Sequence, residues 1–144
     1  MRNQRGFSLV ELLIVVAIIG VIAAIAVPGF LAARRASNEA AAIGDLRTIG
    51  SAEATYISQE RKFGGFTNLT AATMLDVAWS DNCTRDSFVF QTPTIIGDSM
   101  FDFTTTPASN VQGTKSYAMT EDYVIRYTSG LVVLPSGSGT PVPQ

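Results

Sequence analysis

The stretch Phe7–Ala33 reads FSLVELLIVVAIIGVIAAIAVPGFLAA and contains one charged residue, Glu11. As an α-helix it would extend about 40 Å, which exceeds the roughly 30 Å hydrocarbon core of a bilayer. Leu, Ile, Val and Ala occupy every face of such a helix, so none of its sides suits water. The stretch therefore predicts a helix that spans a membrane or packs against other apolar helices.

Glu11 separates three interpretations of this segment. A carboxylate within hydrocarbon costs at least about 2.5 kcal/mol, and such a group usually has a partner. A cleaved secretory signal has an apolar core of about 7–15 residues, shorter than the uncharged run 12–33. An ordinary membrane anchor fits the length but leaves Glu11 unexplained. The third interpretation is a helix that begins in a membrane and later packs against copies of itself.

The residues that flank and interrupt the helix add detail. Residues 1–6, MRNQRG, form a cationic leader that we expect to stay in the cytoplasm, with the C-terminal domain on the other side. Gly20 and Pro28 interrupt the apolar run. Proline removes a backbone donor and clashes with the preceding turn, which predicts a kink or local melting near Ala24–Pro28. Membrane helices also tolerate such residues without breaking, and the sequence favours neither outcome.

Residues 34–60 continue the helix with a different character. An apolar stripe recurs at spacings of three, four and seven, and it contains Ile43, Leu46, Ile49, Gly50 and Ile57. Glu39 and Glu53 fall close to this stripe and make it imperfect. We expect one continuous helix of about 50 residues, apolar all round in its first half and amphipathic in its second.

The remaining sequence changes to a period of two. Residues 61–85 are expected to be a connecting loop with a short helical turn near Ala71–Leu75. Residues 86–134 are expected to form a small antiparallel sheet, with strands that include Tyr123–Tyr127 and Leu131–Leu134 and a tight turn at Ser129-Gly130. Residues 135–144 read as a flexible tail. The predicted fold class is α+β, a long N-terminal helix packed on a small antiparallel β-sheet.

Composition excludes several functions. The net charge of −2 gives no basic surface for nucleic acid, and the chain contains no His, the commonest general base and metal ligand. Cys83 is the single cysteine and cannot form an internal disulfide. No nucleophile lies beside a base and no Gly-rich phosphate loop is present. We therefore expect no catalytic residue, metal, cofactor or small-molecule substrate, and a protein that is not an enzyme.

The segment RGFSLVELLIVVAIIGVIAAIAVPGFLAARRASNEA resembles the class III signal and N-terminal helix of the type IV pilin superfamily. Gly6, Phe7, Glu11 and Pro28 all fall where that family places them. The resemblance implies that prepilin peptidase cleaves between Gly6 and Phe7 and methylates the new amine of Phe7. It also implies that Glu11 faces the Phe7 amine of a neighbouring subunit during assembly.

Reasoning from the residues agrees with this pairing. Glu11 needs a cation, and cleavage after Gly6 would create one at Phe7 in the same apolar layer. An ion pair in low dielectric is strong once formed, and either partner alone there is costly, so the pair would favour one axial register between subunits.

The resemblance implies a structural subunit that forms a helical homopolymer, a type IV pilus serving motility, adhesion or DNA uptake. The precursor would lie in the inner membrane, meet an inner-membrane pilus assembly platform, and end in an extracellular pilus. A type II secretion pseudopilin is the alternative, and a membrane-anchored binding domain is a remote one. Cys83 lacks the partner that closes a C-terminal loop in many pilins. No Asp or Glu follows Asp122, so we carry over no calcium site, and this favours the pilus subunit.

Overall fold

The computed structural model describes residues 6–96, 99–134 and 137–143. It divides into two compact units, Met1–Arg34 and Arg35–Gln144, and one helix contributes to both. Most of the expected leader and positions 135, 136 and 144 of the expected tail lie outside the described residues.

Helix α1 covers Leu9–Glu60, a single element of 52 residues. This confirms the prediction of one long continuous helix. The chain stays helical through Ala24–Pro28 in this structure, and unwinding of Gly20–Pro28 when the helix changes environment stays a prediction. Pro28 removes only one backbone hydrogen bond, and long helical runs on both sides hold the turn in place.

The first unit carries an apolar surface that is open to its surroundings. Large hydrophobic side chains are exposed along its length, from Phe7, which is 81% exposed, to Phe30, which is 66% exposed. Within the described residues, α1 is the one helix long and apolar enough to cross a membrane. The apolar first half predicted from the sequence is therefore present.

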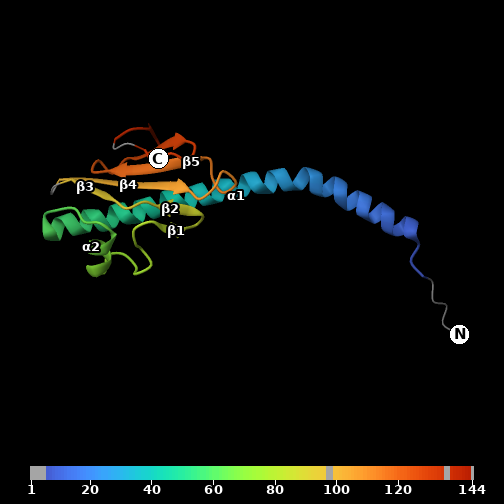
Figure 1. Ribbon diagram of the computed structural model, residues 1–144, viewed down its shortest axis with the longest axis horizontal. Helices are drawn as coiled ribbons and strands as arrows, with labels where there is room; N and C mark the ends of the chain where they lie inside the picture. Colours follow the sequence, from blue (N-terminus) through green and yellow to red (C-terminus); the bar gives the residue numbers. More distant parts are fainter. Residues whose placement is uncertain (1–5, 97–98, 135–136, 144) are drawn as a thin grey trace. The chain divides into compact units, whose positions relative to one another are not determined.

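The second half of α1 buries one stripe against the sheet (Figure 1). Leu46 and Ile49 are fully buried, and Ile43 and Ile57 pack at the margin of the same cluster. This confirms the amphipathic half of the helix. Glu53, expected to disturb the stripe, is itself fully buried within it.

The sheet is antiparallel throughout and, within the described residues, has seven strands in the order β1-β2-β4-β5-β6-β7, with β3 paired to β4. Both β2 and β3 pair with β4, at Thr105–Pro107 and at Met100–Asp102 respectively. The elements after α1 are α2 (Phe66–Ala71), β1 (Cys83–Arg85), β2 (Phe88–Phe90), β3 (Thr94–Ile96), β4 (Met100–Pro107), β5 (Lys115–Thr120), β6 (Ile125–Ser129) and β7 (Thr140–Pro141).

Three details differ from the sequence-based prediction. The short helix starts at Phe66, before the expected turn at Ala71–Leu75, and β1 lies inside the expected connecting loop. The strand predicted at Leu131–Leu134 is wrong, because this segment forms no ladder. The chain turns away at Gly130, where φ is +101°, and β7 from the tail pairs with β6 instead. An apolar run alone does not show which segment occupies a sheet edge.

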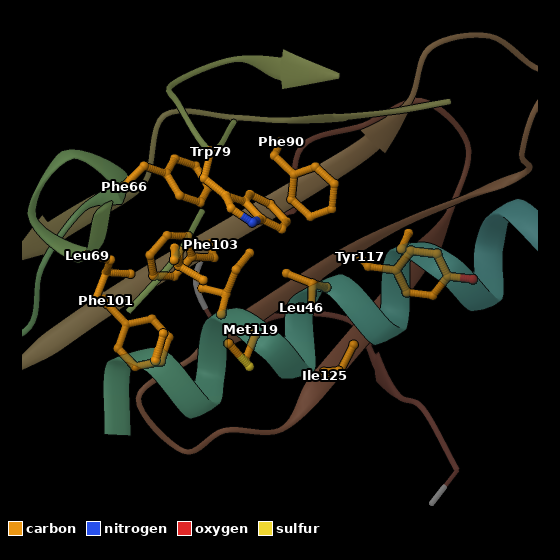
Figure 2. Packing of buried hydrophobic residues seen from close by; sticks show 14 of the residues in the cluster. Leu46, Phe66, Leu69, Trp79, Phe90, Phe101, Phe103, Tyr117, Met119 and Ile125 are labelled. Atoms are coloured by element: carbon orange, nitrogen blue, oxygen red, sulfur yellow. The ribbon is translucent and has the colours of Figure 1, made fainter. Parts of the chain in front are cut away.

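Aromatic side chains fill the layer between α1 and the sheet (Figure 2). Alternation along β4 sends Phe101 and Phe103 into this layer, each 1% exposed, and leaves Asp102 on the opposite face. Trp79 stacks on Phe66 with ring centroids 5.7 Å apart. These four aromatic side chains thus belong to one core between the helix and the sheet.

Candidate functional site

The N-terminus of α1 places Glu11 close to Ser8. The backbone N–H of Ser8 donates to Glu11 Oε2 at 2.9 Å, and the Ser8 hydroxyl accepts from the Val10 N–H at 3.3 Å. Ser8-x-x-Glu11 has the pattern of a capping box, in which side chains satisfy the amides that a helix start leaves unpaired. In the single subunit Glu11 therefore stabilises the start of its own helix. The spacing of Ser8 and Glu11 in the sequence is itself a signal for such a cap.

The Gly6–Phe7 bond precedes the first helical turn. Residues 6–8 are not helical, Phe7 is 81% exposed, and a Cβ built at Gly6 would meet no atom within 4 Å. Exposed backbone outside regular structure is the kind of segment that a peptidase can bind. Gly20 and Pro28 lie farther along, inside the helix, and do not gather with Phe7 and Glu11.

The first turns of α1 also carry an apolar face that has the form of a helix-packing site. Leu9, Leu12, Leu13 and Val16 line a shallow apolar depression. Their spacing of three, four and seven places them on one face, and four such residues form the hole that receives a side chain from a facing helix. The turns of α1 that carry Glu11 therefore also present, on a different face of the helix, a surface suited to a second apolar helix.

A second polar site, missed from the sequence, joins α1 to the chain between β4 and β5. Glu39 Oε1 accepts from the Thr114 N–H at 2.8 Å and from the Thr114 hydroxyl at 2.9 Å. Glu39 Oε2 accepts from the Tyr117 hydroxyl at 3.3 Å and lies 3.9 Å from Lys115 Nζ. Glu39 therefore joins α1 to the segment around Thr114 by hydrogen bonds, which explains a charged residue beside the apolar stripe.

Two further side chains of α1 reinforce this attachment. Arg35 Nε donates to the Val111 carbonyl at 3.2 Å, and Asn38 Nδ2 donates to the Gln112 carbonyl at 2.9 Å. Positions 35, 38 and 39 share one helix face, a spacing that could have indicated a polar contact. Their combined effect is to fix the loop before β5 on the helix.

Glu53 forms a third polar feature, inside the core. Its carboxylate accepts the Gly64 N–H at 3.3 and 3.2 Å. Burial raises the pKa of Glu53 from 4.5 to about 7, and the Gly64 hydrogen bond opposes that rise. This contact ties the segment after α1 back onto the helix.

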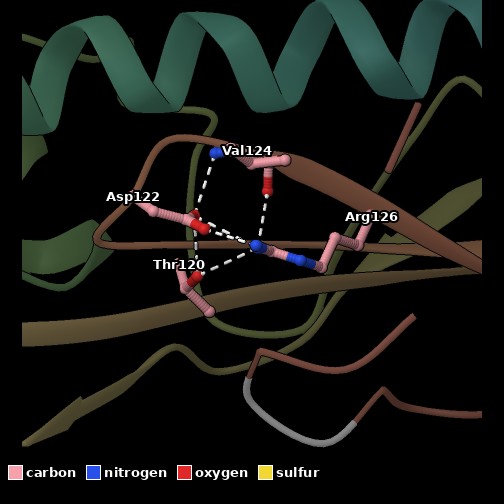
Figure 3. A network of polar contacts seen from close by, with 4 residues as sticks. All are labelled: Thr120, Asp122, Val124 and Arg126. Atoms are coloured by element: carbon pink, nitrogen blue, oxygen red, sulfur yellow. Dashed lines mark hydrogen bonds and ion pairs between the residues drawn. The ribbon is translucent and has the colours of Figure 1, made fainter. Parts of the chain in front are cut away.

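The turn between β5 and β6 is held by a polar network on the surface (Figure 3). Asp122 accepts from the Thr120 hydroxyl at 2.9 Å and from the Val124 N–H at 3.0 Å, and it forms an ion pair with Arg126. Hydrogen bonding from Arg126 is the main cause that lowers the pKa of Asp122 to about 2. The network therefore shapes the turn between β5 and β6.

The part of the chain that the structure describes contains no group of three or more His, Cys, Asp or Glu placed to hold a metal ion. Cys83 is a free thiol and partly buried.

Comparison with known proteins locates the resemblance at the N-terminus. Residues 1–27 match the family model described as the prokaryotic N-terminal methylation motif. The type IV major pilin protein PilA of Myxococcus xanthus is 41% identical over 66 residues, which cover 46% of this chain and 30% of that protein.

Two other relatives agree. The type IV wide pilus major component PilA4 of Thermus thermophilus is 56% identical over 39 residues, 27% of this chain and 30% of that protein. The type IV major fimbrial protein FimA of Dichelobacter nodosus is 34% identical over 87 residues, 58% of this chain and 53% of that protein. The matched segments thus span less than two thirds of each relative. The methylation motif, these relatives and the long helix packed on an antiparallel sheet together support the type IV pilin superfamily.

Proposed function

We propose that the chain is a structural subunit that polymerises through its N-terminal helix into a type IV pilus, which serves motility, adhesion or DNA uptake. The exposed apolar surface of the first unit carries this proposal, because water-soluble monomers rarely expose apolar patches beyond a few hundred Å². The surface needs lipid in the precursor and neighbouring helices afterwards. The names of the relatives, major pilin and major fimbrial protein, favour a pilus over a type II secretion pseudopilus.

Processing would come first. The precursor would lie in the inner membrane, where prepilin peptidase would cleave the open Gly6–Phe7 bond and methylate the new amine of Phe7. The inner-membrane assembly platform would then transfer the subunit into an extracellular filament. Mass spectrometry of sheared surface filaments tests both steps, because it reports the cleavage, the methyl group and the location together.

Assembly would give Glu11 a second partner. In the single subunit its carboxylate accepts one backbone amide, from Ser8, so it keeps lone pairs for another donor. The Phe7 amine of a neighbouring subunit, in the same apolar layer, would supply that donor and neutralise the charge. An ion pair there also opposes axial slippage of one helix past another, which apolar contacts alone permit.

Substitution of Glu11 tests this role. We expect Glu11→Ala to leave the subunit in the membrane and to reduce filaments strongly in electron micrographs of cells. Glu11→Gln keeps the cap acceptor for Ser8 but loses the charge, so it separates capping from pairing. Glu60→Gln, at an exposed position at the end of α1, removes a charge elsewhere and serves as the control. Normal fibres in the Glu11→Gln variant would refute the pairing.

A further inference from the structure

The outer face of the sheet contains a polar pocket that the proposed polymerisation does not use. It has a volume of about 380 Å³ and lies where β3 and β4 meet. Its polar lining consists of Asn82, Gln91, Thr92, Thr94, Asp102 and Thr104. Asp102 and Thr104 alternate along β4 with the buried Phe101 and Phe103, so the pocket opens on the face of the sheet opposite to α1.

Asp102 is the least satisfied group in this pocket. Its Oδ1 atom is buried and has no hydrogen-bond partner among the described residues. Burial, and then the nearby charge of Glu121, raise the pKa of this carboxyl. Thr94 is its direct cross-strand neighbour on β3, which brings a hydroxyl beside the carboxylate. A carboxylate in this condition gains more from a ligand that donates hydrogen bonds than a well-solvated one does.

The other polar side chains that line the pocket include both hydrogen-bond donors and hydrogen-bond acceptors. Asn82 Nδ2 donates to the Thr92 hydroxyl at 3.2 Å, and Gln91 Nε2 donates to the Thr106 hydroxyl at 3.4 Å, which leaves both amide oxygens as acceptors. The hydroxyls of Thr94 and Thr104 can each donate and accept. A ligand that fits such a lining must itself both donate and accept at several points, as a polyhydroxylated molecule does.

The charge of the lining narrows the ligand further. Of the described residues that line the pocket, none is Lys or Arg, and Asp102 disfavours an anion. Val133 and Leu134 add a small apolar wall that can contact carbon-bound hydrogens. The volume lies within the range of small-ligand sites and accommodates one ring.

We propose that this pocket binds a neutral hexose unit, with Asp102 accepting ligand hydroxyls and Thr94 and Thr104 completing the hydrogen bonds. All lining residues of the site lie in the second unit, whereas the proposed polymerisation runs through the N-terminal helix.

Saturation-transfer NMR on the full chain tests the proposal. The protein is held in a zwitterionic detergent without a sugar headgroup, since a maltoside would compete. The probes are glucose, galactose, mannose and N-acetylglucosamine, each at millimolar concentration, with glucuronate as the anionic comparison. We expect saturation transfer to at least one neutral sugar and none to glucuronate.

Two near-isosteric variants assign the signal to the pocket. Asp102→Asn and Thr104→Val should each weaken binding about tenfold, the effect of losing one hydrogen bond of roughly 1.4 kcal/mol. Glu60→Gln, an equal charge change at an exposed position outside the pocket, should leave binding unchanged. Circular dichroism shows whether each variant is folded. One folded pocket variant is enough to assign the NMR signal to the pocket. No transfer to any of the four neutral sugars, or equal binding by wild type and both folded variants, would overturn the proposal.

Discussion

The buried carboxyl of Glu53 makes the stability of the second unit depend on pH. The Glu53 side chain is fully buried, and its carboxylate accepts a hydrogen bond from the Gly64 N–H. Its pKa is about 7 in the folded chain against 4.5 for the ordinary group. The folded state therefore holds the proton more tightly than the unfolded state does, so stability is highest below pH 4.5 and falls as the pH rises through 7.

The magnitude follows from the gap between the two pKa values. A gap of about 2.5 units at roughly 1.4 kcal/mol per unit gives about 3 kcal/mol lost between acid and neutral pH. Glu53→Gln abolishes this titration and keeps an oxygen that can accept the Gly64 N–H. We therefore expect the free energy of unfolding of the variant to change by about 3 kcal/mol less than that of wild type over the same pH interval.

Urea unfolding of the full chain in detergent, repeated from pH 4.5 to 8, measures this difference. Trp79 is the single tryptophan and is 4% exposed, so its fluorescence reports loss of the core directly. Burial also raises the pKa of Asp45 and Asp102, but both residues are present in wild type and variant and cancel in the comparison. In the Glu60→Gln control, the free energy of unfolding should change with pH as it does in wild type. If the free energy of unfolding changed equally with pH in wild type and in Glu53→Gln, Glu53 would not be the cause of the pH dependence.

Four other outcomes are expected. Gly6 replaced by Ala or a larger residue should block leader removal, visible as an uncut precursor on a gel; the space at Gly6 is open, so the fold should not change. Asp122→Asn should lower the free energy of unfolding by less than about 1 kcal/mol, because the Asp122 side chain is 41% exposed. In acid unfolding, the wild-type protein should lose this stabilisation as the pH falls from 3.8 toward 2, because the lowered pKa of Asp122 delays its protonation to that range. Gly113→Ala should destabilise by about 1–3 kcal/mol in urea unfolding, because its Cβ would lie 2.8 Å from Phe88. Gly44→Ala, in open helix surface, should instead stabilise by up to about 1 kcal/mol.

Local patterns predicted much of this fold. The apolar run before Ala33 and the stripe around Leu46 and Ile49 each act within one helix, and both are present. In β4, the alternation of Phe101 and Phe103 with Asp102 likewise coincides with the buried face. These patterns succeed because the period of side chains along a helix or strand decides which residues share a face, whatever the rest of the chain does.

Pairing between distant segments was not predictable in the same way. The run Leu131–Leu134 has the composition of a strand, yet Thr140–Pro141 occupies the edge of β6. In the sequence Glu39 only interrupts the apolar stripe. Its hydrogen-bond partner Thr114 lies 75 positions away, so no local pattern indicates their contact. A hydrogen bond across such a separation leaves no periodic signal at either end.

The order of the residues is enough to predict an apolar helix that carries one acid and an α+β unit after it. The folded chain is needed to show that Glu11 caps its own helix through Ser8 and that Glu53 is buried in the core against Gly64. It is also needed to show that Asp102 lines a pocket, where its Oδ1 atom has no hydrogen-bond partner among the described residues. The physical reason is that hydrophobic burial is a property of each residue and its spacing, whereas the state of a polar group depends on which donor the folded chain brings to it.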